Sequence, residues 1–314
     1  MDNLDALVRG VVEGSPRALG RALSLVERGG EAARELLRRL PAPSRWLPTV
    51  AFTGPPGAGK STLVEQVGLF WQSRGEPVAV LAVDPSSPFS GGALLGDRLR
   101  MPRLVEAGGF VRSVATRGSL GGVSAACGDF LELLRAAPFA WALVETVGVG
   151  QDEVDVASMV DTVVLLQVPG LGDDVQLAKA GVVEVAHVFV VNKKDRPGAG
   201  ELVQMLQGLV AQTPETSWRP RVLATVATTG EGVEALVQAI QEHQAHLAEN
   251  HRRQELAQRR AERRLRALVG ELVARRLEQL GPVWEQRVRQ VAQGRLDAFA
   301  AACELVEYLG GKRR

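Results

Sequence analysis

Hydrophobic positions recur at helical spacing near both ends of the chain and form short runs between them. At the N-terminus leucine and valine occupy positions 4, 7, 8, 11 and 12, and a second set follows the break at Gly14-Ser15-Pro16. A spacing of three and four residues is typical of amphipathic helices. The pattern predicts helices as far as about residue 40, where Pro41-Ala42-Pro43-Ser44 interrupts it.

From Trp46 to about residue 240, short apolar runs alternate with longer stretches that suit helices. This alternation is typical of a mostly parallel sheet with helices on both faces. The predicted fold class is therefore α/β, a doubly wound sheet flanked by helices. The runs that predict its strands are Thr49–Thr53, Val78–Val83, Phe110–Val114, Ala140–Glu145, Thr162–Gln167, His187–Val191 and Val222–Thr225.

Beyond residue 240 the pattern predicts helices and no strand. Leucines follow one stripe of a long helix over residues 241–281, and arginine pairs such as Arg259-Arg260 flank that stripe. Gly281-Pro282 ends this helix, and a shorter helix follows as far as Tyr308. We expect three parts: an N-terminal helical extension (1–45), a nucleotide-binding domain (46–240) and a C-terminal helical arm (241–314).

The first predicted strand leads into the phosphate-binding pattern G-x-x-x-x-G-K-S, and a helix-compatible segment follows. Glycines let backbone N–H groups fold around phosphate oxygens, and the new helix directs its positive end at the same anion. In such a loop Lys60 reaches the β- and γ-phosphates, and the Ser61 hydroxyl ligates Mg²⁺. The predicted nucleotide-binding residues of this loop are Gly54, Pro55, Pro56, Gly57, Ala58, Gly59, Lys60, Ser61 and Thr62.

Three carboxylates are placed to serve a magnesium ion. Asp84 and Glu145 lie at the ends of predicted strands, and Asp97 lies in a glycine-rich loop between them. Ligands of doubly wound sheets bind beyond the carboxyl ends of the strands, so Asp84 and Glu145 should face the site. Because Mg²⁺ prefers oxygen ligands, the sequence predicts a magnesium site beside the phosphate loop.

The pattern N-K-x-D after the sixth predicted strand predicts a guanine-binding loop. Asp195 can accept hydrogen bonds from the ring N1–H and the exocyclic amine of guanine, whereas adenine would leave its carboxylate unpaired. Asn192 would brace the loop, and the stem of Lys193 would cover one face of the base. After the last predicted strand, a backbone N–H would bind the guanine carbonyl. The predicted base-binding residues are Asn192, Lys193, Lys194, Asp195, Val226, Ala227 and Thr228.

Composition limits the remaining classes of function. The 314 residues carry 37 basic and 36 acidic side chains, so the net charge demands no large nucleic-acid surface. Two cysteines, Cys127 and Cys303, are too few for a disulfide framework. Asp2 and Asp5 argue against a signal peptide, and no run of about 18 apolar residues predicts a membrane span. We therefore expect a cytoplasmic protein.

With these residues placed, the chain resembles the MeaB/ArgK family of G proteins, the chaperone GTPases of the cobalamin enzyme methylmalonyl-CoA mutase. The resemblance covers nearly the whole chain, including both helical ends, and implies the fold shared with signal-recognition-particle and nickel-insertion GTPases. The segments that carry it are Asp84-Pro85-Ser86-Ser87-Pro88, Ser90-Gly91-Gly92, Leu95-Gly96-Asp97-Arg98, Glu145-Thr146-Val147-Gly148-Val149-Gly150-Gln151 and Pro169-Gly170-Leu171-Gly172-Asp173-Asp174.

The resemblance implies a role for each site residue. The residues around Mg²⁺ would be Ser61, Asp84, Asp97 and Glu145. The catalytic residues would be Lys60, Glu145, Asp173 and Lys179. Lys60 and Mg²⁺ would stabilise the negative charge that develops as water attacks the γ-phosphate. Hydrolysis would be slow until the partner arrives, because Asp173 and Lys179 would contribute only in its presence. An ordinary solvated helix lysine is the alternative for Lys179.

The resemblance also implies switches, a partner and an assembly. The segment as far as Gln151 would be a nucleotide-sensing switch, and Val168–Lys179 would be a second switch that meets the mutase. The C-terminal helices would form a homodimer interface. The chain departs from many G proteins where Thr225-Val226-Ala227 replaces a Ser-Ala pair, so one serine contact to the base is missing while the Ala227 N–H is kept.

Two other functions remain open from the sequence. A metal-insertion GTPase of the nickel class is suggested by His243, His246 and His251, although solvated helix histidines explain this pattern better and no cysteine accompanies it. A P-loop kinase acting on a transport-related protein matches an older label of the family. The arginine-rich tail fits either a dimer arm with solvated charges, favoured by its leucine stripe, or an RNA-binding surface.

Overall fold

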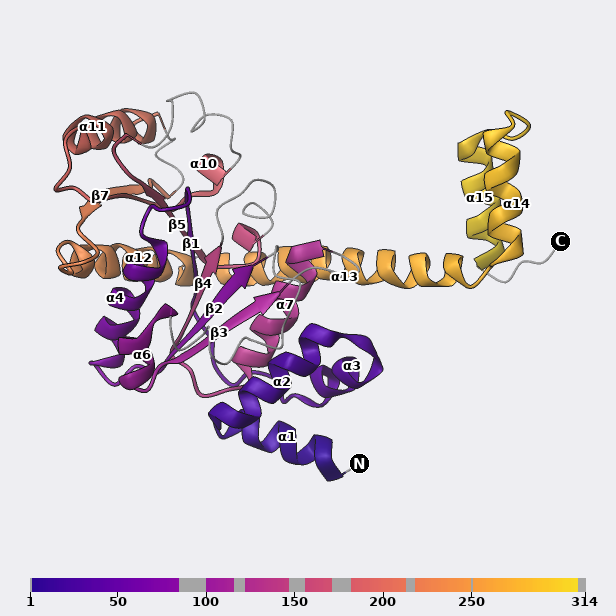
Figure 1. Cartoon of the computed structure of the whole chain (residues 1–314), viewed down its shortest axis with the longest axis horizontal. Helices are drawn as coiled ribbons and strands as arrows, with labels where there is room; N and C mark the ends of the chain where they lie inside the picture. Colours follow the sequence, from indigo (N-terminus) through magenta and orange to yellow (C-terminus); the bar gives the residue numbers. More distant parts are fainter. Residues whose placement is uncertain are drawn as a thin grey trace. The chain divides into compact units, whose positions relative to one another are not determined.

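The fold is built on one sheet of seven parallel strands. The structure is a computed structural model, and it describes residues 2–84, 100–115, 122–146, 156–170, 182–212, 218–249 and 251–309. The strand order is β3-β2-β4-β1-β5-β6-β7 (Figure 1). The predicted α/β fold is confirmed, and the end of each predicted strand lies within one residue of the observed one. The strands are β1 (Thr49–Thr53), β2 (Val78–Asp84), β3 (Phe110–Ala115), β4 (Trp141–Thr146), β5 (Thr162–Gln167), β6 (Val188–Asn192) and β7 (Arg221–Thr225).

Successive strand residues pack on opposite faces of this sheet. Val50 and Phe52 of β1 belong to one apolar core, and Ala51 belongs to the other. The first core is completed by α4 (Lys60–Gln72), α6 (Pro102–Glu106) and α12 (Val233–Ala248). The second is completed by α1 (Asp2–Val12), α2 (Pro16–Arg28), α3 (Gly30–Arg39) and α7 (Gly122–Arg135). Two further helices, α10 (Val182–Val185) and α11 (Ala199–Val210), flank β6 along the chain. Because strands such as β1 are covered on both faces, they appear in the sequence as uninterrupted apolar runs.

The N-terminal helices share the core of the sheet. Leu19, Leu23 and Leu36 are fully buried in the same cluster as Phe130 of α7. The break predicted at Gly14-Ser15-Pro16 begins α2, where the Ser15 hydroxyl accepts a hydrogen bond from Ala18 N–H and Pro16 takes the first helical position. These helices therefore depend on the sheet for their burial.

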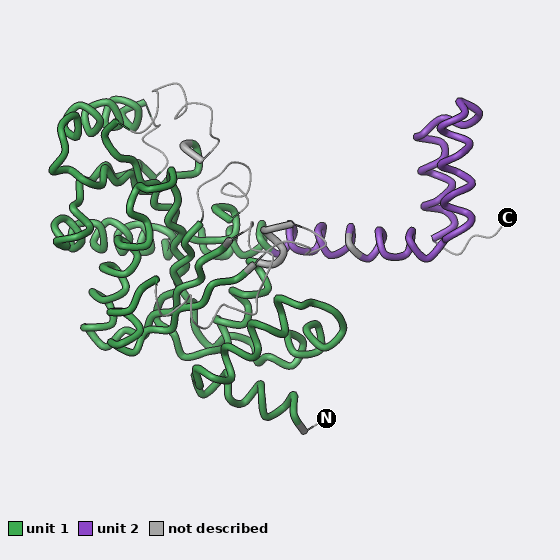
Figure 2. The backbone as a smooth tube through the Cα atoms, viewed as in Figure 1, with its two compact units in different colours: residues 1–260 green, residues 261–314 purple. Residues whose placement is uncertain are grey.

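The chain divides into two compact units, residues 1–260 and 261–314 (Figure 2). The boundary falls within α13 (Arg252–Glu278). The second unit contains α14 (Pro282–Ala292) and α15 (Ala298–Leu309), which replace the single helix predicted after Gly281-Pro282. Gly294, with φ of 65°, lies between them. The division predicted at residues 45 and 240 stays a prediction.

The prediction of one unbroken helix over residues 241–281 is wrong. Helix α12 ends at Ala248, Glu249 is extended, and α13 starts at Arg252 after His251 adopts a left-handed φ of 61°. An L residue in that conformation cannot continue a right-handed helix. The Arg253 guanidinium then donates to the Gln244 carbonyl of α12 at 3.2 Å, so the two helices are in contact across the break.

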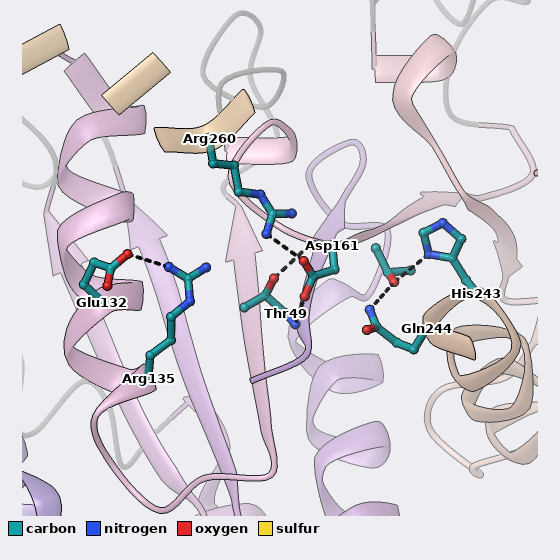
Figure 3. A network of polar contacts seen from close by, with 8 residues as sticks. Thr49, Glu132, Arg135, Asp161, His243, Gln244 and Arg260 are labelled. Atoms are coloured by element: carbon teal, nitrogen blue, oxygen red, sulfur yellow. Dashed lines mark hydrogen bonds and ion pairs between the residues drawn. The ribbon is translucent and has the colours of Figure 1, made fainter. Parts of the chain in front are cut away.

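A buried ion pair attaches α13 to the start of β1 (Figure 3). Arg260 Nη1 lies 2.6 Å from Asp161 Oδ1, while Asp161 Oδ2 accepts from the Thr49 N–H at 2.8 Å. The two side chains are 8% and 0% exposed, so Arg260 is not one of the solvated charges expected for this helix. Removing one partner of such a pair typically costs about 3–5 kcal/mol, because the other charge remains buried.

One histidine of α12 also differs from the expectation of a solvated side chain. His243 is buried, and its ring centroid lies 4.1 Å from that of His187, with the two planes tilted by 33°. The Thr162 hydroxyl shares a hydrogen bond with His243 Nδ1 at 2.8 Å and accepts another from Gln244 Nε2. The Val163 N–H donates to His187 Nδ1 at 3.0 Å, so the His187 ring is neutral. Burial lowers the pKa of His187 to about 4 and that of His243 to about 2.

These two histidines should make folding stability fall in mild acid. Their folded pKa values lie below the usual 6.5, so the unfolded chain binds protons first and stability declines as pH drops from 6.5 toward 4. Between pH 7.5 and 5.5 we expect a loss of roughly 1 kcal/mol per histidine. Urea unfolding at the two pH values measures this loss of stability. The His243→Gln variant should lose about half as much unfolding free energy between them. Equal unfolding free energies at both pH values would contradict the assignment.

Candidate nucleotide-binding site

The phosphate loop starts where β1 ends, at the centre of the sheet. Strand β1 lies between β4 and β5, where the order of the strands reverses and ligands of doubly wound sheets bind. Gly54 has φ of 138°, and a Cβ there would lie 2.3 Å from the Leu166 carbonyl oxygen of β5. Only glycine allows the backbone to turn away from β1 this close to its neighbour.

Lys60 opens α4 and directs its side chain back into the phosphate loop. Its Nζ donates to the carbonyl oxygens of Gly54 at 2.7 Å and Pro55 at 3.0 Å, and the residue is only 7% exposed. The loop thus surrounds a positive charge that water hardly reaches, where an electrostatic interaction is much stronger than in bulk water. The positive end of α4 adds to the same field.

Ser61 and Glu145 meet beside this charge. The Ser61 hydroxyl donates a short hydrogen bond to Glu145 Oε1, and Glu145 is 6% exposed. Burial raises the pKa of Glu145, against the Ser61 hydrogen bond and the nearby positive charges of Arg100 and Lys60. Within the described part of the chain, Glu145 Oε2 has no hydrogen-bond partner. An unpaired buried carboxylate oxygen beside a hydroxyl is a donor set that suits a hard cation.

Helix α4 is held to β4 at both of its ends. Ser61 contacts Glu145 at the site, and at the opposite end the Trp71 and Trp141 rings stack with centroids 4.0 Å apart and planes at 7°. Trp141 Nε1 also donates to Glu76 Oε2 at 2.5 Å. The helix that follows the phosphate loop and the strand that carries Glu145 are therefore fixed to each other along their length.

The remaining predicted magnesium and catalytic residues fall only partly within the described ranges. Asp84 is the last residue of β2, and Ala82 of that strand pairs with Glu145 of β4, so both strands reach the same sheet edge. Asp97, Asp173 and Lys179 lie outside the described residues, as does Gln151. Their roles stay predictions.

Asn192 joins the base-recognition loop to two other loops. Its Nδ2 donates to the Ala58 carbonyl of the phosphate loop at 2.7 Å. Its Oδ1 accepts from Thr225 Oγ1 and from Ala227 N–H, both at 3.1 Å. The Ala227 N–H, predicted to bind the guanine carbonyl, thus has a partner within the protein, and that predicted contact remains untested. The sequence placed Thr225 at the start of this loop but assigned it no contact, and the structure shows that its hydroxyl donates to Asn192.

Lys193 and Asp195 lie in the same loop but differ in their surroundings. Lys193 adopts a left-handed φ of 58° and donates from Nζ to the Gly57 carbonyl at 2.7 Å, so its stem crosses over the phosphate loop. Asp195 is exposed, and no described residue donates a hydrogen bond to its carboxylate. The carboxylate is therefore available to a ligand that offers two donors.

Gly59→Ala should weaken nucleotide binding by disturbing Asn192. A Cβ at this position would lie 2.5 Å from Asn192 Nδ2, in a residue whose φ is already 88°. Losing the contact of Asn192 with the phosphate loop should raise the Kd for GDP roughly 10-fold, measured by calorimetry. Gly75→Ala is the control, because Gly75 has φ of 76° and open space around it, so only backbone strain is added. Equal GDP affinity of the two variants would show that the contact of Asn192 with the phosphate loop does not support binding.

Among the helices of the described residues, none combines the length and the hydrophobicity that a membrane span requires.

Comparisons with known proteins agree with this geometry. A family model described as "Methylmalonyl Co-A mutase-associated GTPase MeaB" matches residues 19–280. A putative GTPase of Pyrococcus horikoshii is 41% identical over 317 residues, covering 99% of this chain and 100% of that protein. The mitochondrial "Methylmalonic aciduria type A homolog" of Mus musculus is 38% identical over 263 residues, covering 77% of this chain and 63% of that protein. A solved structure described as "Crystal structure of LAO/AO transport system kinase" matches with a TM-score of 0.72 and 27% identity, covering 99% of this chain and 98% of that one.

Proposed function

Because this chain belongs to the MeaB family of methylmalonyl-CoA mutase-associated GTPases, we propose that it is a nucleotide-controlled switch on a cobalamin-dependent acyl-CoA mutase. It is a P-loop GTPase, as its family and its relatives are. The observation that carries the proposal is the phosphate loop joined through Asn192 to a base loop, in a chain that matches the family over residues 19–280. The name of the mouse relative, a methylmalonic aciduria homolog, supports the same partner. The switch would gate cofactor loading of the mutase or protect it.

Guanine is the base that the loop suits. The first three residues of Asn192-Lys193-Lys194-Asp195 make contacts within the protein, and the exposed Asp195 carboxylate is left for the ligand. Guanine presents two donors to one carboxylate, whereas adenine presents none in the same geometry. The selectivity for GTP over ATP would then depend on Asp195.

The donors beside the phosphate loop fit a magnesium ion. Ser61 Oγ and the unpaired Glu145 Oε2 would hold it, together with Asp84 and Asp97 as the family resemblance implies. When bound, Mg²⁺ would neutralise charge on the β- and γ-phosphates. The chain's own contribution is Lys60, whose enclosed ammonium would stabilise the charge that develops as water attacks the γ-phosphorus and the bond to the β-phosphate oxygen breaks. Asp173 and Lys179 would complete the site only when the partner is bound.

A homodimer and a cytoplasmic location belong to the same proposal. Several large apolar side chains of α13, α14 and α15 are exposed in the single chain: Leu265, Val269, Leu272, Trp284, Val288, Phe299, Val306 and Tyr308. A second copy would cover them, since exposed patches of this kind usually mark an interface. Cys127 and Cys303 are unpaired, which suits a reducing compartment.

A second candidate is a kinase that acts on a transport-related protein, which the name of the matching solved structure favours. The nickel-insertion alternative has lost support, because His243 is a buried core residue hydrogen-bonded to Thr162.

Asp195→Asn should change the base that the protein prefers. An amide cannot accept from both guanine donors, so the Kd for GTP should rise roughly 100-fold or more, while binding of xanthosine triphosphate should improve. Competition against a fluorescent nucleotide measures both. Lys60→Ala is the reference, since it should weaken all nucleotides alike and abolish hydrolysis. Retained guanine preference in Asp195→Asn would refute the assigned base contact.

The partner is tested by steady-state GTP hydrolysis with and without a purified cobalamin-dependent acyl-CoA mutase from the same organism. We expect turnover to rise at least roughly 10-fold, because partners supply or order groups that an isolated switch lacks. A Lys179→Ala variant should bind the mutase and respond much less. Absence of any response to every cobalamin mutase of the organism would remove the chaperone role, and transfer of labelled phosphate from ATP to a protein would favour the kinase.

A further inference from the structure

Lys194 occupies the variable position of the N-K-x-D pattern, yet it is bound at both its backbone and its side chain. Its N–H donates to the Thr225 carbonyl of β7 at 3.0 Å. Its Nζ lies 2.5 Å from Glu231 Oε1, with side-chain exposures of 39% and 55%. The base loop is thus attached along one side to the segment that follows β7.

That segment, residues 226–231, is a closed loop held by its own backbone. The Val226 N–H donates to the Glu231 carbonyl at 3.0 Å, and the N–H groups of Thr229 and Gly230 donate to the Val226 carbonyl at 3.1 and 3.0 Å. Gly232, with φ of 80°, follows at once, and a Cβ there would lie 2.4 Å from the Ala224 carbonyl. Glu231 therefore closes the loop with its backbone and contacts Lys194 with its carboxylate.

We propose that the Lys194–Glu231 ion pair is a positioning pair that sets the width of the guanine pocket and so contributes to base selectivity. The inference rests on the proposed recognition of guanine by Asp195. Asp195 directly follows Lys194 in the base loop, and Ala227 and Thr228 lie in the closed loop. The buried Asn192 joins the two loops through Thr225 and Ala227, and the exposed ion pair joins them a second time.

The phosphate side of the site does not share this dependence. Lys60 is held by Gly54 and Pro55, and Lys193 is held by Gly57, so neither contact passes through Glu231. Loss of the ion pair should therefore weaken binding of the base and leave the affinity for the phosphates unchanged. Because both side chains are largely exposed, the pair is weak and screened by salt.

The test is a charge-reversal cycle with Lys194→Glu, Glu231→Lys and the double variant, in the full-length protein. Calorimetry measures the Kd for GDP and for inorganic tripolyphosphate at low salt, with thermal unfolding to verify folding. Each single variant should raise the Kd for GDP about two- to five-fold and leave that for tripolyphosphate unchanged. The double variant should recover most of the GDP affinity, since the pair is restored with its charges exchanged.

A matched control is the Arg221–Glu242 pair, which joins β7 to α12 at 2.9 Å with exposures of 57% and 38%. Reversing it should not change either Kd. The proposal is overturned if the double variant binds GDP as weakly as the worse single variant, or if Lys194→Glu weakens binding while Glu231→Lys does not, which would mean that Lys194 contacts the nucleotide directly. If the unmodified protein binds ADP as tightly as GDP, that result refutes the proposed recognition of guanine by Asp195, which is a separate outcome from failure of the ion-pair proposal.

Discussion

The side-chain amide of Asn192 is the interaction on which the nucleotide site depends. Its nitrogen binds the phosphate loop after β1, and its oxygen binds two groups at the end of β7, so one residue connects three loops that are distant in sequence. A buried amide that satisfies its donor and acceptor in this way specifies one arrangement of its neighbours, because any other leaves a polar group unpaired. The loops for phosphate and base are thereby placed at a set separation before a ligand binds.

At the opposite end of the sheet, side chains also connect elements that are distant in sequence, here through an ion pair and several hydrogen bonds. Three consecutive residues at the start of β5 receive side chains from three elements: Asp161 binds Arg260 of α13, Thr162 binds His243 and Gln244 of α12, and the Val163 N–H binds His187. Asp161 also binds the first amide of β1. The strand that ends in the phosphate loop is consequently anchored at its start by the helices that follow the last strand.

The sequence predicted the elements well where one physical rule dominated. Short apolar runs located all seven strands, because strands such as β1, β4, β5 and β6 are buried along their whole length. It failed where a long-range contact overrode local pattern. The break between α12 and α13 depends on the left-handed His251, and the burial of His243 and Arg260 depends on Thr162 and Asp161, which lie about 80 and 100 residues earlier. No local periodicity contains that information.

Within the site, the sequence pattern indicated which residues lie together but not which contacts each of them makes. It predicted that Asn192 braces its own loop and that the stem of Lys193 covers the base, and it did not indicate that both side chains donate to carbonyl groups of the phosphate loop. No sequence pattern indicated the pairing of Lys194 with Glu231, because an exposed lysine and an exposed glutamate are common at any spacing.

The close approach of Gly59 to Asn192 has a consequence for how such a site can diverge. The space that a side chain at position 59 would need is already filled by the amide of residue 192. Two positions more than 130 residues apart therefore compete for one small volume, so a side chain at position 59 requires a change at position 192. A lineage that exchanged Asn192 for a smaller residue would release the steric part of this restriction on its phosphate loop, while the left-handed backbone would still favour glycine.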